Sequence, residues 1–347
     1  MKRVGLALVG LGNVGRRFLR LLIERNNMLR EKYGLVFSVN CVVDSSGVAI
    51  SDDGFDLPSL LEHKMCGLKL RDLREFEEGL TLAVALDHVK CEILLEASPV
   101  DLNTENPGIS NCRIGLEHGL HLVLANKAPL ALAQAELDFL AADVDVGILY
   151  SATFCGGLPV LNIVRRDMVC GKILGFRGIF NATTNFILEE MLKGCDYADA
   201  LRETQERGIA EADPSIDVCG WDTAAKLVIA ANSIVDAMIT LTDVSVSGIE
   251  DVQPDWLEQC RREGSVLKLV ATAECIDADW RFQVEPTPVP IASFLGSCSG
   301  WEMAIEIQSD IYGKTFYKLW EREPVPTAAS MLRDVVHLAT MGRQGSL

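Results

Sequence analysis

Near its N-terminus the chain reads Val4-Gly5-Leu6-Ala7-Leu8-Val9-Gly10-Leu11-Gly12-Asn13-Val14-Gly15. An apolar run suited to a buried strand passes directly into a G-x-G-x-x-G motif, and residues 16–30 then alternate apolar and charged side chains at helical spacing. This order of strand, glycine turn and helix is the context in which the motif indicates dinucleotide binding. Gly10 permits the tight turn, Gly12 lets a pyrophosphate approach the backbone, and Gly15 lets the helix pack on the strand.

The start of this helix and the end of the next strand complete the predicted cofactor site. We expect the unpaired amides at the helix start, those of Asn13 and Val14 among them, to face the phosphates. A second apolar strand over residues 37–43 ends in Asp44. An acidic residue there usually binds the ribose 2′-hydroxyl and disfavours a 2′-phosphate, so Asp44 favours NAD over NADP. The two serines that follow could still accept a phosphate, and Asp44 could be a simple turn residue, so both cofactors remain open.

Composition and charge exclude several classes of protein. A length of 347 residues is typical of two or three domains, and 49% apolar residues suffice for a large core. The formal net charge of −17 argues against nucleic acid or an anionic membrane as a partner. The eleven cysteines form no C-x-x-C pair, which favours buried free thiols in a reducing, cytoplasmic setting. Residues 146–164 lack charge, but their glycine pair and proline argue against a membrane span.

The order of predicted elements indicates two domains of different architecture. Residues 1–142 alternate short buried strands with helices, which predicts a Rossmann-type α/β dinucleotide-binding domain with a doubly wound parallel sheet. Residues 143–326 mix strands and helices and predict an α+β catalytic and dimerisation domain. A tail helix begins at residue 327, and we expect the segment 327–347 to pack back on the first domain. The expected strands cover 4–9, 37–43, 91–97, 121–125, 147–154, 173–181, 239–245 and 281–285, and the expected helices cover 131–142, 159–168, 185–193, 197–207, 223–236 and 327–340.

A second stretch carries the groups that suit proton transfer. It reads Asp213-Pro214-Ser215-Ile216-Asp217-Val218-Cys219-Gly220-Trp221-Asp222-Thr223-Ala224-Ala225-Lys226. Asp222 and Lys226 are four residues apart, so on a helix they share a face. An amine held among carboxylates is a plausible general acid or base. Taken alone, the pair is equally an ordinary helix ion pair that stabilises by about 0.2–0.5 kcal/mol.

These motifs together resemble the homoserine dehydrogenase family, over nearly the whole chain. The family signature has a Gly, an Asn or Asp before Pro, and then D-x-x-G-x-D-x-x-x-K. Here it runs from Gly208 to Pro214 and then from Asp217 to Lys226 without a gap. Four further blocks resemble the family, namely Ala125-Asn126-Lys127, Gly156-Gly157-Leu158-Pro159, the stretch 181–188 and Pro326-Thr327-Ala328-Ala329-Ser330.

The resemblance implies an NAD(P)-dependent oxidoreductase that interconverts L-homoserine and L-aspartate-4-semialdehyde on the route to threonine and methionine. It assigns Lys226 as the proton donor to the aldehyde oxygen and Asp217 as its support. Lys127 would lie beside the cofactor and help hold the substrate. Glu211 and Asp222 would bind the amino and hydroxyl ends of the substrate, and Ser98 would face the cofactor ribose.

The resemblance also implies a cation, a partner and a domain boundary. Members of the family often hold a monovalent cation with backbone carbonyls, which correspond here to those of Ser151, Phe154, Gly156 and Leu158. They form dimers through sheets of the second domain, so we expect a homodimer. The chain stops after the tail helix, which matches a short form without a C-terminal regulatory domain.

Two departures from the family pattern keep other functions open. Ala182 replaces a glycine, and Glu321-Arg322-Glu323 stands where the family has a small G-A-G turn near the nicotinamide. The first alternative is a related oxidoreductase acting on another small amino-acid aldehyde or alcohol. The second is a dinucleotide-binding protein without turnover, although such a protein has no need of the lysine and carboxylate set.

Overall fold

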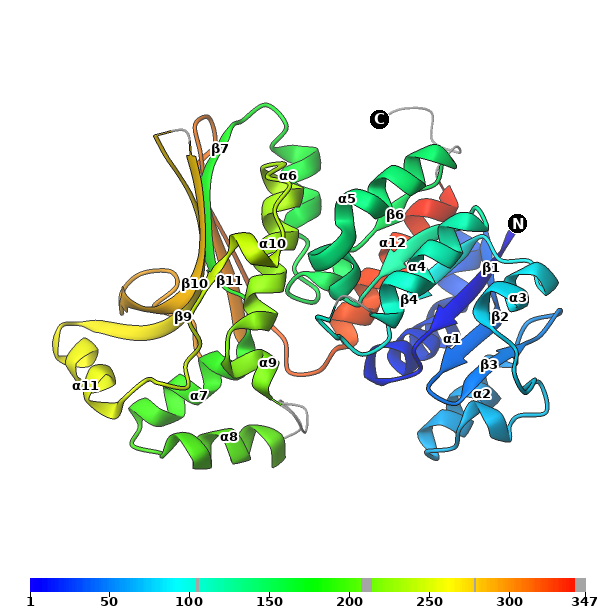
Figure 1. The fold of residues 1–347 in the computed structure, drawn as a ribbon, viewed down its shortest axis with the longest axis horizontal. Coiled ribbons are helices and arrows are strands. Elements are labelled where there is room, and N and C mark those ends of the chain that lie inside the picture. Colours follow the sequence, from blue (N-terminus) through cyan, green and yellow to red (C-terminus); the bar gives the residue numbers. More distant parts are fainter. Residues whose placement is uncertain (104–105, 207–213, 278, 341–347) are drawn as a thin grey trace. The chain divides into compact units, whose positions relative to one another are not determined.

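The computed structural model describes residues 1–103, 106–206, 214–277 and 279–340, and the chain divides into two compact units (Figure 1). The first unit consists of Met1–Gly157 with Glu323–Leu347, and the second of Leu158–Arg322. Residues 143–157 therefore belong to the first unit, together with the end of the chain.

The first unit is built on a six-stranded sheet with the order β3-β2-β1-β4-β5-β6. All neighbouring strands are parallel except β2 and β3, which are antiparallel. The predicted Rossmann-type α/β domain is confirmed, although the short antiparallel edge strand was not predicted. The strands are β1 (Lys2–Val9), β2 (Leu35–Asp44), β3 (Gly47–Ile50), β4 (Ile93–Glu96), β5 (His121–Leu124) and β6 (Ile148–Leu149).

Helices cover this sheet and bury an almost entirely apolar core. The buried face of α1 includes Phe18, Leu19 and Leu22, and it shares its core with Met331 and Val335 of α12. The helix at the end of the chain therefore packs on the first helix of the same unit, as Figure 1 shows. The helices of the unit are α1 (Asn13–Tyr33), α2 (Leu57–Met65), α3 (Leu82–His88), α4 (Pro107–Glu117), α5 (Ala128–Asp143) and α12 (Val325–Thr340), with 3₁₀ turns at η1 (Leu70–Asp72) and η2 (Ser151–Thr153).

The second unit has a six-stranded sheet in the order β12-β11-β7-β9-β10-β8, antiparallel except between β10 and β8. α10 packs on this sheet and against α6 (Figure 1), so the predicted α+β class is confirmed. The strands are β7 (Ile173–Ile179), β8 (Ser245–Val246), β9 (Ser265–Ile276), β10 (Asp279–Pro290), β11 (Glu302–Ser309) and β12 (Gly313–Trp320). The helices are α6 (Val160–Asp167), α7 (Ala182–Leu192), α8 (Tyr197–Glu206), α9 (Ser215–Val218), α10 (Trp221–Ile234) and α11 (Pro254–Arg262), with a 3₁₀ turn at η3 (Leu241–Asp243).

Several local predictions were wrong. The expected strand over 239–245 is mostly a turn around η3, because the Asp243 carboxylate accepts hydrogen bonds from the backbone N–H and the hydroxyl of Thr240 at 2.8 and 2.9 Å. Such side-chain bonds to the backbone compete with a strand ladder. The expected strand over 147–154 is limited to β6. Two of the cysteines expected to be buried, Cys66 and Cys170, are exposed.

A buried carboxylate ties the tail helix to the loop after β6. Asp334 of α12 is 3% exposed and accepts hydrogen bonds from the backbone N–H and the hydroxyl of Ser151, both at 2.8 Å. Burial raises the pKa of Asp334 above its ordinary value, although the two bonds from Ser151 oppose the shift. Folding of the first unit therefore joins residues 183 positions apart through one side chain.

Removing this carboxylate should destabilise the first unit. Asp334→Ala leaves two buried donors of Ser151 without their acceptor, so we expect the free energy of unfolding in urea to fall by about 1–3 kcal/mol. His337→Ala, at an exposed position of the same helix, is the matched control and should change it by less than about 0.5 kcal/mol. Equal stability of the two variants would contradict the assigned role.

The same carboxylate should leave a signature in the pH dependence of stability. Because the pKa of Asp334 is raised in the folded chain, the native state keeps this proton at pH values where the unfolded state has lost it. The contribution of Asp334 to the free energy of unfolding should therefore fall as pH rises from its ordinary pKa to its folded pKa. Asp334→Asn should abolish that slope in urea titrations measured across this interval. A slope that persists unchanged would assign it to another group.

Candidate active site

The glycine turn after β1 is required by close backbone contacts. Gly10 has a φ of +92°, and its N–H donates to the carbonyl of Val43 at 2.8 Å. A Cβ atom at Gly10 would collide with the backbone of Ala97, and one at Gly15 would collide with the carbonyl of Gly10. A Cβ at Gly12 would meet no atom within 4 Å. Two glycines thus allow the turn to pack, while the third leaves its backbone open to a ligand.

The N-terminus of α1 carries positive potential. No side chain caps this helix, and its first turn holds no acidic residue. Arg16 donates to the carbonyl of Gly12 at 3.2 Å and to the side-chain oxygen of Asn13 at 3.1 Å. Uncapped amides at a helix start are a ready binding site for phosphate.

One acid of the Glu321-Arg322-Glu323 turn lies against this helix. The Glu323 carboxylate accepts from Arg17 of α1 at 3.3 Å. The pair is exposed, with 67% of the Glu323 side chain accessible, so it contributes little to stability. The pair matters for the local charge near the start of α1, because the positive charge of Arg17 offsets the negative charge of Glu323.

Asp44 ends β2, as predicted, but its carboxylate already has partners. One oxygen accepts from the backbone N–H and hydroxyl of Ser46 at 2.7 and 2.6 Å, and the other accepts from the amine of Lys64 at 2.7 Å. Burial alone would raise the pKa of Asp44, but the bonds from Lys64 and Ser46 outweigh it and hold the pKa below its ordinary value. Asp44 is therefore an anion at neutral pH, and a cation stands beside it.

The remaining predicted groups of the first unit follow β4 and β5. Ser98 lies two residues after β4, and Lys127 immediately precedes α5, after β5. The amide of Asn126 donates to the hydroxyl of Ser98 at 3.1 Å, so these two loops are joined. The sheet order reverses direction between β1 and β4, and ligands of doubly wound sheets bind outside the carboxyl ends of strands at such a point.

The second unit holds a buried lysine and carboxylate at the start of α10. The amine of Lys226 donates to the Phe180 carbonyl at 2.6 Å and to the Asp222 carboxylate at 2.7 Å. Lys226 and Asp222 are only 9% and 7% exposed. Asp222 lies in the first turn of α10, where the helix dipole favours an anion. The interaction is thus the predicted i,i+4 pair, placed in the interior rather than on a solvated surface.

Asn181, which the sequence motifs do not mark as a site residue, joins this pair to a second acid. Its amide nitrogen donates to Asp217 at 2.7 Å and to Asp222 at 2.8 Å. Its oxygen accepts from the backbone N–H of Thr184 at 2.9 Å and so caps α7. The available signal was its place at the head of the block 181–188, in the N-cap position of a helix.

These groups can hold and transfer a proton. An ammonium on Lys226 has a carboxylate and a carbonyl as acceptors, and Asn181 links that carboxylate to Asp217. The structure thus brings together Lys226, Asp222 and Asp217 in the second unit. Glu211 lies outside the described residues.

The residues of the predicted cation loop lie on both sides of the boundary between the two units. The Gly156 carbonyl accepts from the hydroxyl of Ser330 at 3.1 Å. Ser151 and Phe154 are buried in the first unit, and Leu158 begins the second. Within the described part of the chain, no group of three or more His, Cys, Asp or Glu side chains could hold a metal ion.

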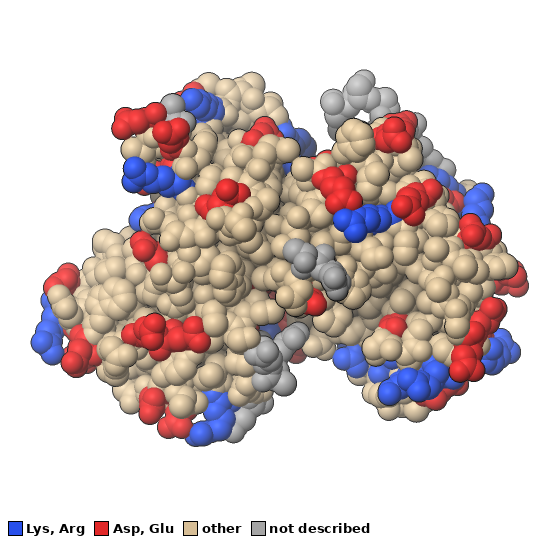
Figure 2. All heavy atoms as spheres, viewed as in Figure 1, with Lys and Arg blue, Asp and Glu red and all other residues tan. Residues whose placement is uncertain are grey.

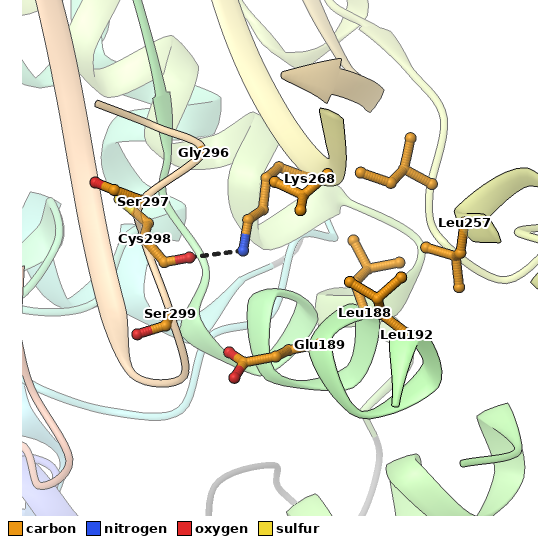
Figure 3. A pocket seen from close by; sticks show the side chains of 11 residues that line it. Leu188, Glu189, Leu192, Leu257, Lys268, Gly296, Ser297, Cys298 and Ser299 are labelled. Carbon is orange, nitrogen blue, oxygen red and sulfur yellow. Dashed lines mark hydrogen bonds between the residues drawn. The ribbon is translucent and has the colours of Figure 1, made fainter. Parts of the chain in front are cut away.

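A small cavity of about 160 Å³ lies elsewhere in the second unit (Figure 3). Leu188, Leu192 and Leu257 form one wall of it, and Lys268 of β9 forms part of the other. The Lys268 amine donates to the Cys298 carbonyl at 2.7 Å and to the Asn185 oxygen at 2.6 Å. Burial lowers the pKa of Lys268. We interpret this lysine as an anchor for the loop between β10 and β11, and we assign no chemistry to the cavity.

Charged side chains are spread over the surface of the two units. On the face drawn in Figure 2, acidic and basic side chains are interspersed, and the described Lys and Arg residues form no broad basic field. A search of the described helices for a stretch long and apolar enough to span a membrane found none.

Comparison with known sequences gives consistent matches. A family model described as homoserine dehydrogenase matches residues 159–336. The homoserine dehydrogenase of Methanocaldococcus jannaschii is 34% identical, with 95% of this chain and 97% of that protein covered. The NAD(+)-dependent homoserine dehydrogenase of Pseudomonas canavaninivorans is 32% identical, with 97% of each covered.

Solved structures agree with the sequence matches. A putative homoserine dehydrogenase from Archaeoglobus fulgidus superposes with a TM-score of 0.85 at 31% identity, covering 96% of this chain and 99% of that one. A hyperthermophilic archaeal homoserine dehydrogenase in complex with NADPH has a TM-score of 0.82 at 24% identity and covers all of both chains. At that identity the second likeness supports the fold alone.

Proposed function

The chain belongs to the homoserine dehydrogenase family, and on this premise we propose how its own residues perform the family reaction. It is an NAD(P)-dependent oxidoreductase that acts on a CH–OH group and interconverts L-homoserine and L-aspartate-4-semialdehyde. We further propose that it serves threonine and methionine biosynthesis in the cytoplasm. The observation that carries the mechanism is the buried Lys226 amine, held at 2.6 and 2.7 Å by two oxygen acceptors.

Lys226 is the proposed proton donor. When bound, the nicotinamide supplies a hydride to the substrate carbon or removes one from it. Reduction of the aldehyde builds negative charge on its oxygen, and the Lys226 ammonium neutralises that charge by donating a proton from Nζ. In the reverse direction the neutral amine accepts the proton of the hydroxyl. Asp222 orients the amine, and Asn181 fixes Asp222 against Asp217.

The residues of the first unit fit a dinucleotide. The open backbone at Gly12 and the uncapped amides of Asn13 and Val14 suit a pyrophosphate. Asp44 at the end of β2 suits a ribose 2′-hydroxyl, which supports a preference for NAD. Ser98 is proposed to face the ribose nearer the nicotinamide.

The proposed substrate contacts use charge complementarity. Lys127 would hold the substrate beside the cofactor, while the carboxylates of Asp222 and Glu211 would bind its hydroxyl and amino ends. A monovalent cation on the carbonyls of Ser151, Phe154, Gly156 and Leu158 stays part of the proposal, because carbonyl oxygens suit hard cations and the Gly156 carbonyl keeps a second lone pair.

The alternative functions rested on Ala182 and on the Glu321-Arg322-Glu323 turn, and the turn is the departure that would repel a cofactor. Arg17 pairs with Glu323, so one of the two acids brings less repulsion than the sequence implied. A protein that only binds dinucleotide would also have no use for an amine and two acids joined through a buried amide. We therefore retain the dehydrogenase and no second function.

Truncating Lys226 should slow turnover strongly without loss of cofactor binding. With L-homoserine and NAD or NADP, the wild-type chain should produce absorbance at the reduced-nicotinamide band. Lys226→Ala should lower kcat by about 10²–10⁴-fold, because general acid–base catalysis contributes that much. The dissociation constant of the reduced cofactor, followed by its fluorescence, should stay within about threefold, since Lys226 belongs to the second unit.

Lys193→Ala is the control, because the side chain of this lysine is 57% exposed and pairs with Glu189 and Glu190 at the end of α7. Its turnover should match the wild-type value. Full turnover by Lys226→Ala would refute the proton-donor role, and inactivity of the wild-type chain with both cofactors would refute the proposed substrate.

Asp44 should set the choice between the two cofactors. Asp44→Asn removes an anion from the end of β2, so kcat/KM with NAD should fall and the NAD to NADP ratio should drop by roughly tenfold, equal to about 1.4 kcal/mol. Lys64→Met is the opposing variant, because it leaves the Asp44 charge unpaired and should move the ratio towards NAD. Ratios that move in one direction for both variants would exclude this electrostatic account.

The exposed apolar residues of the second unit support the proposed homodimer. β12 is an edge strand, and Phe316 and Trp320 on one of its faces are 48% and 61% exposed. Large exposed apolar groups that cluster on one element are typical of interfaces. A second copy of this chain covering the sheet would bury them.

Charge on that face should dissociate the dimer. We expect the wild-type chain to have twice its 37.9 kDa mass by light scattering, and Phe316→Lys with Trp320→Lys to run as a monomer. Phe139→Lys, at an aromatic position of the first unit that is 74% exposed, should remain dimeric. A monomeric wild-type chain, or a dimeric double variant, would remove this interface from the proposal.

A further inference from the structure

A fully buried carboxylate lies at the carboxyl end of β4 and has no part in the mechanism above. Glu96 is 0% exposed and is the last residue of that strand. Its backbone pairs with Val9 of β1 on one side and Leu124 of β5 on the other. It therefore stands next to the point where the sheet order reverses, beneath the loops assigned to the cofactor.

The side chain of Glu96 gathers donors from three segments. One oxygen accepts from the backbone N–H of Ser98 at 2.9 Å, from the Ser98 hydroxyl and from the Asn126 amide at 3.4 Å. The other accepts from the Asn111 amide of α4 at 2.9 Å. The Asn126 amide also reaches the Ser98 hydroxyl at 3.1 Å, which closes a triangle of polar side chains.

The same network fixes the residues on both sides of Lys127. The Glu96 carbonyl accepts from the backbone N–H groups of Ala125 and Asn126 at 2.8 and 3.1 Å. The Asn126 oxygen accepts from the N–H of Ala128, the first residue of α5, at 3.0 Å. Lys127 lies between these two fixed residues, so the direction in which its side chain leaves the backbone depends on the network.

Each of the hydrogen-bond partners of the Glu96 side chain named above is a donor, and a carboxylate has only acceptor oxygens to offer them. Burial raises the pKa of Glu96, and the bonds from Ser98, Asn111 and Asn126 oppose that shift. Among the described residues Glu96 takes part in no ion pair, so neutral donors alone satisfy its two carboxyl oxygens. Burying a charge in this way is costly.

We propose that Glu96 is a positioning residue that orients Ser98 and, through Asn126, Lys127 for binding the dinucleotide. This inference rests on the cofactor site of the proposed function but is independent of the substrate. Small displacements of binding groups are costly, since a shift of about 1 Å can reduce rates by roughly 10²-fold. Loss of both carboxyl oxygens of Glu96 should therefore raise the dissociation constant of the dinucleotide, and not only lower the stability of the fold.

The test compares dinucleotide affinity and stability in four chains. Glu96→Ala removes every acceptor, and calorimetry should show a roughly tenfold or larger rise in the dissociation constant of NADH or NADPH. Glu96→Gln keeps one oxygen for Ser98 and Asn126, while the Asn111 amide can reverse to accept from the new NH₂ group. Its affinity should stay within about threefold of wild type and so rescue the loss.

Asn40→Ala provides the control for a purely structural loss. Asn40 is 5% exposed in β2 and donates to the carbonyls of Ser51 and Asp52 at 2.9 and 3.0 Å. Removing these buried bonds should lower the thermal midpoint as Glu96→Ala does but leave dinucleotide affinity unchanged. If Glu96→Ala binds dinucleotide as tightly as Asn40→Ala does, the proposal is overturned.

Two further outcomes keep the test decisive. If Glu96→Ala does not fold, Glu96→Asp replaces it, because its shorter side chain keeps the charge but cannot span from Ser98 to Asn111. Unchanged affinity in folded Glu96→Asp would overturn the proposal, and weakened affinity would support it. If the wild-type chain did not turn over homoserine, the proposed substrate would be refuted, but the measurement of dinucleotide binding would remain valid.

Discussion

The contact between the Lys226 amine and the Asp222 carboxylate is the interaction on which the interior of the second unit depends. A buried ammonium is tolerated only if acceptors replace its lost hydration. The Phe180 carbonyl and Asp222 supply them, and Asn181 holds Asp222 in turn. This requirement connects the end of β7, the start of α7 and the start of α10. The fold of the second unit and its proposed chemistry therefore rely on the same three side chains.

In the first unit, backbone groups rather than side chains provide the positive potential that a dinucleotide requires. A dinucleotide carries phosphates, and the chain has a large excess of acidic residues. Local geometry overcomes that excess: the uncapped start of α1 and the open position at Gly12 present positive potential where the sheet order reverses. Buried donors around Glu96 then hold the neighbouring loops in place.

Periodic and strongly local features were predictable from the sequence. The glycine motif, the parallel strands and α10 with its i,i+4 pair all follow from spacing, since strand and helix periods decide which residues share a face. The short edge strand β3 and the turn around η3 were not predicted. β3 turns back antiparallel to β2, which an alternation of strands and helices does not indicate, and the capping bonds of Asp243 overrode the apolar pattern of residues 239–245.

By itself the sequence determined the family and the class of both domains, and it predicted a lysine and acids suited to proton transfer. Only the tertiary structure decided their environment. It placed Asn181 between two carboxylates, paired Asp44 with Lys64 and Glu323 with Arg17, and buried Glu96 among donors from three segments. These partners lie up to 306 positions apart, so no local pattern could reveal them. Charge state and orientation depend on such distant contacts, because burial and hydrogen bonding act through space rather than along the chain.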